Sequence, residues 1–543
     1  MLVSEKIEYK TFTGAQIIVE TLKNLGVDTI FGYPGGVVLD IYDELFKQND
    51  IKHYLVRHEQ AAVHAAEGYA RVSGKCGVVL VTSGPGATNT VSGIANAYLD
   101  GYPVVVLTGQ VFSKLIGTDA FQEINIVDIT RSCTKAAYQV TSVDTLESTL
   151  KDAFNCAVSG KKGPVVVDLA KDIFSQSINK VPSVKYDDEI KTASVNDLRI
   201  LEKEILSSKH PVIVAGGGVI HSKASDELIK FAETHSIPVV NTMMGIGAYP
   251  QEGKCYSGMI GVFGQKSANE ILRVSDLIIS LGARFNDRIT CCFKEGELSD
   301  KIVQIDINEV EIARAVSVKY GIVSDINYVL SELNKRKFGE YSDWMKGVKN
   351  LKFLDAKRLP VSDKLQSYEV IREIYQYTKS FEPIVTTEVG QHQMWTVQNY
   401  KFNSPNKFLT SGGSGTMGFG LPAAIGASIA SGKQPVICIA GDGSFQMNEQ
   451  ELATCVDYKL PVKIFIMDNG YLGMVRQLQQ KAYGCRFSET KISNPDFIKL
   501  ADAYGIKSSR VERYADIKKA LDDAFKTDEP YIIDFAIEPM EMV

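Results

Sequence analysis

The sequence predicts an α/β fold with three doubly wound domains whose sheets are mostly parallel. Apolar strand-like runs alternate with helical patterns along almost all of the 543 residues, which is typical of parallel sheets covered by helices on both faces. Glycine-rich turns follow several of these runs, as they do where ligands approach the carboxyl ends of parallel strands. Two charged stretches interrupt the pattern and divide a chain that is too long for one core into three parts.

The three parts have similar strand content. We expect domains at residues 10–180, 190–335 and 366–543, with linkers at about 177–194 and 336–365. The expected strands of the first domain are DTIFGYP, GVVLVTSG, YPVVVLTGQ and GPVVVDLA; those of the second are HPVIVAGGG, IPVVNT, SDLIISLGA, KIVQIDI and YGIVSDI; those of the third are EPIVTTEVG, PVICIAGDG, VKIFIMDNG and PYIIDFAI.

Composition excludes several classes of protein. The net charge of −6 offers no basic face for nucleic acid, and no apolar run reaches the 18 or so residues of a membrane span. The start of the chain lacks the basic and then apolar stretches of a secretory signal. The nine cysteines are scattered without a CxxC pair, so we expect reduced thiols and a cytoplasmic protein.

Two predicted neighbouring strands end in side chains that carry oxygen ligands. Asp442 follows VICIAG and Asn469 follows VKIFIMD. Mg²⁺ prefers oxygen ligands and often combines one or two carboxylates with a bound phosphate, so the pair predicts a metal site, with the carbonyl of Tyr471 as a third ligand. Gly441 and Gly443 let the backbone approach the phosphate closely. The alternative to a metal site is that Asp442 and Asn469 belong to two ordinary turns at strand ends.

Two other motifs are weaker. The run Gly413-x-Gly415-x-x-Gly418 matches a dinucleotide fingerprint but lies late in the chain, so we do not expect it to bind NAD(P). The run HEQAAVH (58–64) resembles a zinc motif, but histidines six residues apart face different sides of a helix. Glu59 then begins an alanine-rich helix, where it is stabilised by the helix dipole or bonds a cofactor.

The middle domain carries a possible nucleotide site. GARFNDR places Arg284 and Arg288 after a strand, where each binds a carboxylate or phosphate or else pairs with Asp287 on the surface. The turn AGGG (215–218), with Asp306 and Asp325 at two other strand ends, frames the same edge of the sheet.

Several longer motifs, in order along the whole chain, resemble the catalytic subunit of the acetohydroxyacid (acetolactate) synthases, enzymes that depend on thiamine diphosphate (ThDP). GDGS, followed 25 residues later by Asn469, is similar to the diphosphate and Mg²⁺ signature of ThDP enzymes. The other matching motifs are VRHEQAAVHAAEGYAR, VTSGPGATNT, LTGQVFSKLIGTDAFQE, GARFNDR, GQHQMW, SGGSGTMGFGLPAAIGA and NGYLGMVRQ.

The resemblance implies a function. It implies decarboxylation of pyruvate and carboligation of the hydroxyethyl unit to a second 2-oxo acid, giving 2-acetolactate. The implied cofactors are ThDP, Mg²⁺ and, in the middle domain, FAD. The implied assembly is a homodimer or homotetramer in which the domains of Glu59 and Asp442 meet from different subunits, with a regulatory small subunit as a possible partner.

The resemblance also implies roles for individual residues. The implied catalytic residues are Glu59, Gln122, Lys171 and Gly36. The implied ThDP contacts are Gln391, His392, Gly415, Met417, Gly441, Gly443, Ser444 and Met474. The implied metal ligands are Asp442, Asn469 and Tyr471, and the implied FAD contacts are Gly216, Gly217, Thr242, Arg284, Asp306 and Asp325. Arg288, Phe121 and Leu478 are implied to meet the substrates.

Four features depart from the family pattern. Leu478 stands where biosynthetic members usually carry Trp, so we expect weaker preference for 2-oxobutyrate as acceptor. Phe263 replaces a His near the flavin, which leaves the retention of FAD open, and Asp468 replaces the usual Asn before Asn469. The chain printed here stops at EPMEMV, before the family's Pro-rich tail, so a shorter lid is expected. A different acceptor, simple decarboxylation and a non-catalytic paralogue are the alternatives.

Overall fold

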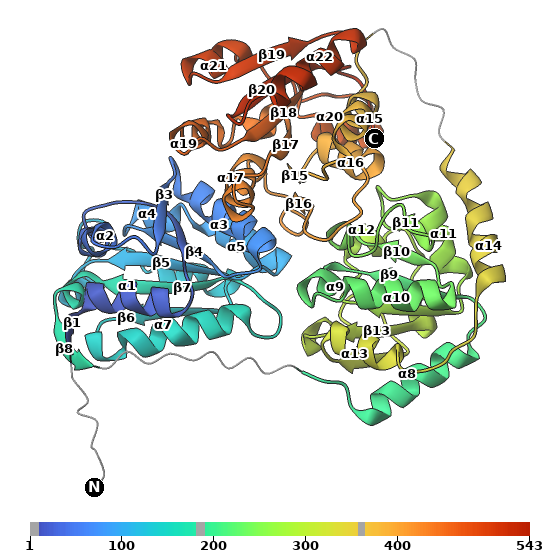
Figure 1. Ribbon diagram of the computed structural model, residues 1–543, viewed down its shortest axis with the longest axis horizontal. Coiled ribbons are helices and arrows are strands. Elements are labelled where there is room, and N and C mark those ends of the chain that lie inside the picture. The colour runs from blue at the N-terminus through green and yellow to red at the C-terminus, as the bar shows by residue number, and fades with distance from the viewer. Residues whose placement is uncertain (1–9, 181–190, 357–363) are drawn as a thin grey trace.

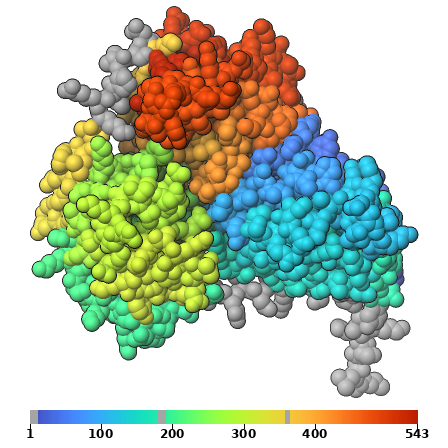
Figure 2. Space-filling model, turned by 180° about the vertical axis from the view of Figure 1, so that it is seen from behind, coloured from blue at the N-terminus to red at the C-terminus, as the bar shows by residue number. Residues whose placement is uncertain are grey.

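Three lobes, each built on one parallel sheet, make up the protein (Figure 1). The computed structural model describes residues 10–180, 191–356 and 364–543. From behind, the three lobes lie against one another in a single body (Figure 2). The fold class expected from the sequence is confirmed. Within the described residues, no helix combines the length and the hydropathy needed to cross a lipid bilayer.

The first sheet has six parallel strands. In spatial order they are β3 (Lys52–Leu55), β2 (Thr29–Tyr33), β4 (Gly77–Val81), β5 (Val104–Gln110), β7 (Val165–Ala170) and β6 (Ala136–Val140). One face packs against α1 (Gly14–Asn24), α2 (Leu39–Phe46) and α7 (Val143–Val158). The other packs against α3 (Glu59–Ser73), α5 (Val91–Asp100) and the short α6 (Ile126–Thr130), while α4 (Pro85–Thr88) follows β4.

The middle sheet also has six parallel strands. In spatial order they are β11 (Tyr256–Met259), β10 (Val239–Asn241), β9 (Pro211–Ala215), β12 (Leu277–Leu281), β13 (Ile302–Asp306) and β14 (Tyr320–Val323). Its faces are covered by α8 (Val195–Ser207), α10 (Ser225–His235) and α13 (Ile326–Leu333), and by α11 (Lys266–Val274) and α14 (Ser342–Asn350). The short helices α9 (Gly217–His221) and α12 (Asp287–Thr290) follow β9 and β12.

The third sheet repeats the pattern. Its strands are β16 (Phe408–Thr410), β15 (Ile384–Thr387), β17 (Val436–Gly441), β18 (Val462–Asp468), β20 (Tyr531–Ala536) and β19 (Lys507–Val511). One face packs against α15 (Ser367–Thr378), α16 (Gln391–Asn399) and α22 (Tyr514–Phe525), the other against α17 (Gly420–Ala430), α19 (Leu452–Asp457) and α21 (Phe497–Ala503). The helices α18 (Asp442–Phe445) and α20 (Gly473–Ala482) follow the ends of β17 and β18.

The expected strands are present, but the sequence pattern missed others and misjudged both linkers. Seven strands were not predicted: β1 (Lys10–Thr13) and β8 (Ser177–Lys180), which form a separate two-stranded sheet, and β3, β6, β11, β16 and β19, which lie at the edges of the three six-stranded sheets. The stretch 177–194 was wrong as a linker at its start, because β8 pairs antiparallel with β1; residues 181–190 lie outside the described residues. The second expected linker contains α14, whose buried Val348 packs in the apolar cluster of the middle domain.

Small residues let α3 pack closely against α17 and so join the first domain to the third. One continuous apolar cluster contains side chains of both helices and of both sheets. A Cβ on Gly426 would lie only 1.8 Å from the carbonyl oxygen of Ala65, and one on Gly68 would lie 2.3 Å from that of Ala423. The two backbones therefore approach more closely than side chains at these positions would permit.

We expect Gly426→Ala to lower the free energy of unfolding by about 1–3 kcal/mol, because the new methyl group forces the two helices apart. Thermal and urea unfolding would measure the change. Gly347→Ala is the matched control, since Gly347 is exposed on α14 with no atom closer than 4.0 Å to a new Cβ and should gain helix propensity. Equal stability of Gly426→Ala and the wild type would contradict the close packing.

Candidate active site

The two predicted metal ligands lie at the carboxyl ends of neighbouring strands. Strands β17 and β18 pair in parallel, with Gly441 opposite Met467, so Asp442 and Asn469 follow directly at the same edge of the sheet. The Asp442 carboxylate is buried and accepts hydrogen bonds from the backbone N–H groups of Gly443 (2.9 Å) and Gly470 (2.7 Å). The side-chain oxygen of Asn469 accepts one from the N–H of Tyr471 (2.9 Å).

An amide that the sequence analysis did not single out holds this carboxylate in place. Asn494 donates from one Nδ2 both to Asp442 (2.8 Å) and to Asp468 (2.7 Å), and its own oxygen accepts from Gln446 (3.0 Å). Arg510 binds Asp468 from the other side at 3.3 Å. The acid at position 468 is therefore part of a bonded network behind the metal-ligand position. No sequence motif marks Asn494, because it lies 52 residues after Asp442.

The electrostatics of Asp442 fit a cation. The pKa of its carboxyl is raised to about 7, mainly by burial and in part by the neighbouring Asp468, while hydrogen bonds from Asn494, Gly470 and Gly443 oppose the rise. A bound cation would offset that cost. Among the described residues, no cluster of three or more His, Cys, Asp or Glu side chains could hold a metal. This donor set suits Mg²⁺, which needs few carboxylates when a phosphate completes its shell.

Buried polar atoms without partners surround the same strand ends. His392 Nε2 and Gln391 Oε1 are both buried and have no hydrogen-bond partner. Burial lowers the pKa of His392 to about 3, so its ring is neutral. A Cβ on Gly441 would lie 2.8 Å from His392 Nδ1, and a Cβ on Gly443 would lie 2.8 Å from the side chain of Leu472. A polar ligand such as a diphosphate fits this glycine-lined cradle and its unpaired atoms.

Of the remaining predicted ThDP contacts, Met417 and Ser444 lie near this cradle, whereas Gly415 and Met474 line a large cavity. The methyl carbon of Met417 is 3.9 Å from the Cβ position of Gly443. The Ser444 hydroxyl donates to the carbonyl of Val389 at 3.4 Å. Gly415 has a φ of +66°, a backbone conformation that favours glycine, and borders a large cavity together with Met474.

The predicted catalytic residues Glu59, Gln122, Lys171 and Gly36 all belong to the first domain; we call them the Glu59 group, and Asp442 with its neighbours the Asp442 group. Glu59 is the first residue of α3, and its carboxylate accepts a hydrogen bond from Asn89 Nδ2 at 2.9 Å. Lys171 Nζ donates to the carbonyl of Gly36 at 3.3 Å. Gln122 has a φ of +63°, which is rare outside glycine. Its backbone lies about as close to Gly84 as a Cβ there would permit (3.0 Å).

The structure leaves some predicted substrate contacts in solvent. The Phe121 side chain is 88% exposed, and Arg288 is 73% exposed with its guanidinium 3.4 Å from Asp287. The surface ion pair considered from the sequence is thus present, although Arg288 also borders the cavity. Among the described residues, no hydrogen bond or ion pair joins the Glu59 group to the Asp442 group.

The start of α3 is held from the third domain by a residue without a sequence motif. The buried carboxylate of Glu451 accepts hydrogen bonds from the N–H groups of Arg57 (2.8 Å) and His58 (3.0 Å), the two residues before Glu59. Burial raises the pKa of Glu451 to about 6, and these hydrogen bonds partly oppose that rise. No signal in the sequence marked Glu451, which lies in the polar run NEQE (448–451).

A cavity of about 1030 Å³ opens between the three domains. That volume is at the upper end of the range for pockets that hold a whole small-molecule ligand, about 300–1,000 Å³. Five of the six predicted flavin contacts line it: Gly217, Thr242, Arg284, Asp306 and Asp325. Gly216 does not line it and instead packs against the backbone, since a Cβ there would lie 2.1 Å from the carbonyl oxygen of Gly282. Phe263, Met474 and Leu478 border the same cavity, so it reaches from the middle domain to α20.

We expect Asn494→Ala to weaken divalent-cation binding about 10–100-fold, because Asp442 and Asp468 then repel each other without the shared amide donor. A titration of Mg²⁺ followed by calorimetry in the presence of ThDP would measure it. Asn179→Ala is the control, since Asn179 lies on β8 of the first domain, where its side-chain oxygen accepts a hydrogen bond from Thr11 (2.7 Å). Unchanged Mg²⁺ affinity would contradict the supporting role of Asn494.

Comparison with known proteins agrees with this geometry. Three family models match: the N-terminal TPP binding domain of thiamine pyrophosphate enzymes at residues 12–129, their central domain at 199–333 and their C-terminal TPP binding domain at 388–535. Thiamine pyrophosphate is another name for ThDP. Asp442 and Asn469 fall in the last range and Glu59 in the first.

Curated relatives match nearly the whole chain. A probable acetolactate synthase large subunit of Methanocaldococcus jannaschii is 43% identical over 97% of this chain and 92% of its own length. The acetolactate synthase large subunit of Lactococcus lactis is 42% identical over 99% and 94%, and that of Haemophilus influenzae is 40% identical over 98% and 96%. The chain therefore belongs to the acetolactate synthase large-subunit family of thiamine pyrophosphate enzymes.

Proposed function

We propose that this protein uses ThDP and Mg²⁺ to decarboxylate pyruvate and to join the remaining two-carbon unit to a second pyruvate, giving 2-acetolactate. The observation that carries the proposal is the buried Asp442 beside Asn469 at adjacent strand ends, next to the unpaired polar atoms of Gln391 and His392. The relatives named above are acetolactate synthase large subunits, which supports the choice of donor and product.

Each domain has a proposed task. The first domain (10–180) holds the pyrimidine end of ThDP, the third (366–543) holds the diphosphate and the metal, and the middle (190–335) holds a flavin. ThDP supplies a carbon nucleophile and the electron sink for loss of CO₂ from a 2-oxo acid. Asp442, Asn469 and the carbonyl of Tyr471 provide oxygen atoms for Mg²⁺, and His392 and Gln391 provide polar atoms for the phosphates.

Glu59 is the proposed proton-handling residue. Its carboxylate lies at the start of α3, oriented by Asn89 and by the bonds from Arg57 and His58 to Glu451. A carboxylate fixed in this way holds or releases a proton at a cofactor nitrogen without rotating away. Gln122, Lys171 and Gly36 provide hydrogen-bonding groups beside it for the substrate, and Arg288 provides a guanidinium for the carboxylate of the acceptor.

The two groups of site residues imply a second copy of the chain. In the part of one chain that the structure describes, the Glu59 group and the Asp442 group share no hydrogen bond, although both are needed at one cofactor. We propose a homodimer in which each site takes Glu59 from one subunit and Asp442 from the other. The relatives are named large subunits, so a regulatory small subunit is a further proposed partner.

FAD is the proposed occupant of the large cavity. The proposal is supported by the five predicted contacts on its wall and by its length, which reaches from Asp325 to Gly415. Phe263 lies on the wall, where its ring provides an apolar surface for an aromatic ligand. We also propose a cytoplasmic location, supported by nine cysteines that are all unpaired.

Glu59→Gln should reduce acetolactate formation from pyruvate about 100-fold or more, because the amide cannot hold the proton that the carboxylate holds. ThDP binding measured by calorimetry should change little, which separates loss of chemistry from loss of cofactor. Glu44→Gln, on the surface helix α2, should retain full activity. Wild-type rates in Glu59→Gln would contradict ThDP catalysis at this site.

Leu478→Trp should shift the choice of acceptor toward 2-oxobutyrate by about tenfold or more. A larger apolar side chain would contact the one methylene group that 2-oxobutyrate has in addition to pyruvate. Leu478 borders the cavity and is 52% exposed, which leaves space for an indole. Competition between pyruvate and 2-oxobutyrate, with both acetohydroxyacids quantified, would measure the ratio. Val475→Trp is the control, as Val475 lies on the same helix and is partly exposed. An unchanged product ratio in Leu478→Trp would show that this residue does not select the acceptor.

A further inference from the structure

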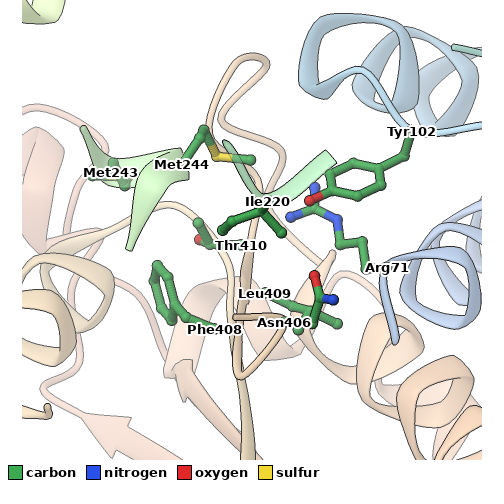
Figure 3. A pocket seen from close by; sticks show the side chains of 9 residues that line it. All are labelled: Arg71, Tyr102, Ile220, Met243, Met244, Asn406, Phe408, Leu409 and Thr410. Carbon is green, nitrogen blue, oxygen red and sulfur yellow. The ribbon is translucent and has the colours of Figure 1, made fainter. Parts of the chain in front are cut away.

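The three domains meet at the end of α5, around a buried ionic cluster. Arg71 of α3 lies between Glu67 and Asp100 and forms ion pairs with both carboxylates, and all three residues are buried. Figure 3 shows Arg71 and Tyr102 of the first domain facing Met244 of the middle domain and the strand at Phe408–Thr410 of the third. Buried ionic groups require such complete pairing, so this junction has a defined geometry.

Four hydrogen bonds join the loop 411–418 of the third domain to Asp100 of this cluster and to the neighbouring Asn96. The backbone N–H groups of Gly412 (3.2 Å) and Gly413 (2.6 Å) donate to the Asp100 carboxylate. The hydroxyls of Ser411 (2.5 Å) and Thr416 (3.0 Å) donate to the side-chain oxygen of Asn96, which itself donates to Glu67. The first domain thus provides the acceptors for both glycine N–H groups.

Within the third domain the loop is held mainly at its two ends, where Gln393 donates to the carbonyl of Ser411 (3.3 Å) and Asn448 to that of Gly418 (2.8 Å). Gly412 and Gly413 have no side chains, and neither position has room for one, since a Cβ would lie 2.1 Å from the sulfur of Met244 or 2.8 Å from Leu99. The loop also serves two sites at once: Gly412, Gly413 and Gly415 border the large cavity, whereas Met417 approaches Gly443 of the diphosphate cradle. Its conformation therefore matters for both ligands.

The end of α5 is itself part of the cavity wall, which includes Leu99 and Asp100. The carbonyl of Leu99, next to Asp100, accepts a hydrogen bond from Arg284 at 2.6 Å. The ring of Tyr102 lies 4.1 Å from the Arg71 guanidinium and 4.5 Å from the ring of His221, at the end of α9. Because α9 begins at the cavity wall, a ligand that orders Arg284 or α9 acts on residues bonded to the Asp100 cluster.

We infer that Asp100 is a positioning residue that couples occupancy of the large cavity to the conformation of the loop 411–418. Through this loop the cavity ligand and ThDP bind cooperatively. The inference rests on the proposed function, in which the ligands are FAD and ThDP. Such coupling needs no change of fold. The first ligand to bind orders the junction, so the second ligand binds with a smaller loss of conformational entropy. Coupling of this kind is reciprocal, so each ligand tightens the other.

The test is a comparison of Asp100→Asn with the wild type. ThDP dissociation constants are measured by calorimetry with and without saturating FAD, and FAD dissociation constants by flavin fluorescence with and without ThDP and Mg²⁺. We expect each ligand to tighten the other about fivefold or more in the wild type. In Asp100→Asn, one of the two oxygen atoms that accept from the glycine N–H groups is replaced by an NH₂ donor, and the charge that pairs with Arg71 is lost. Both ratios should therefore fall close to one.

Two further variants separate coupling from general destabilisation. Asp276→Asn removes a carboxylate that also accepts two backbone N–H bonds, from Lys209 and His210, but within the middle domain, and should keep the wild-type ratios. Ser411→Ala leaves the ionic cluster intact and removes one link of the loop to Asn96, together with the bond that the Ser411 hydroxyl accepts from the N–H of Thr416. Its ratios should therefore fall between the two extremes. It serves as the test if Asp100→Asn fails to fold.

Hydrogen–deuterium exchange gives an independent readout. Exchange of the peptide that spans residues 411–418 should slow on FAD binding in the wild type and stay unchanged in Asp100→Asn. Wild-type ratios in Asp100→Asn or in Ser411→Ala, or no coupling in a wild type that binds both ligands, would overturn the inference. A wild type that binds neither ThDP nor FAD would instead overturn the proposed function.

Discussion

The close contact between α3 and α17 is the constraint on which the rest of the structure depends. Glycine and alanine at the crossing let the two backbones touch, and one apolar cluster then runs from the first sheet to the third. The same contact places Glu451 against the start of α3 and the 411–418 loop against the end of α5. The contact between α3 and α17 thus determines both the orientation of Glu59 and the position of the loop beside the cofactor sites.

Parallel sheets explain why the functional residues gather where they do. Each sheet presents the carboxyl ends of its strands at one edge, where turns are free to carry ligands. Asp442 and Asn469 follow adjacent strands of the third sheet, whereas Asp306 and the turn at Gly217 follow strands of the middle sheet. The large cavity borders both domains, so a flavin in it would contact the loop that serves ThDP. A cofactor without a redox task would then still contribute by ordering that loop.

The predictability of each element follows from its burial. The central strands are almost fully buried, most of them contain long apolar runs, and all were predicted. The missed strands β3, β6, β11, β16 and β19 lie at sheet edges, and most of them are partly exposed. Helix α14 was mistaken for a linker because only Met345 and Val348 among its residues are buried. Asp442 and Asn469 were predictable from strand-end spacing, and the family resemblance added Glu59. Asn494, Glu451 and Asp100 were not, because their partners lie 26 to over 300 residues away along the chain.

The proposed function requires that two pyruvates become one acetolactate and one CO₂ at a site assembled from these residues. It can be measured by incubating the purified protein with pyruvate, ThDP and Mg²⁺ and quantifying pyruvate, CO₂ and acetolactate together. We expect one acetolactate and one CO₂ for every two pyruvates consumed, and no product when Mg²⁺ is removed by chelation. Acetaldehyde in place of acetolactate, or no consumption of pyruvate, would contradict it.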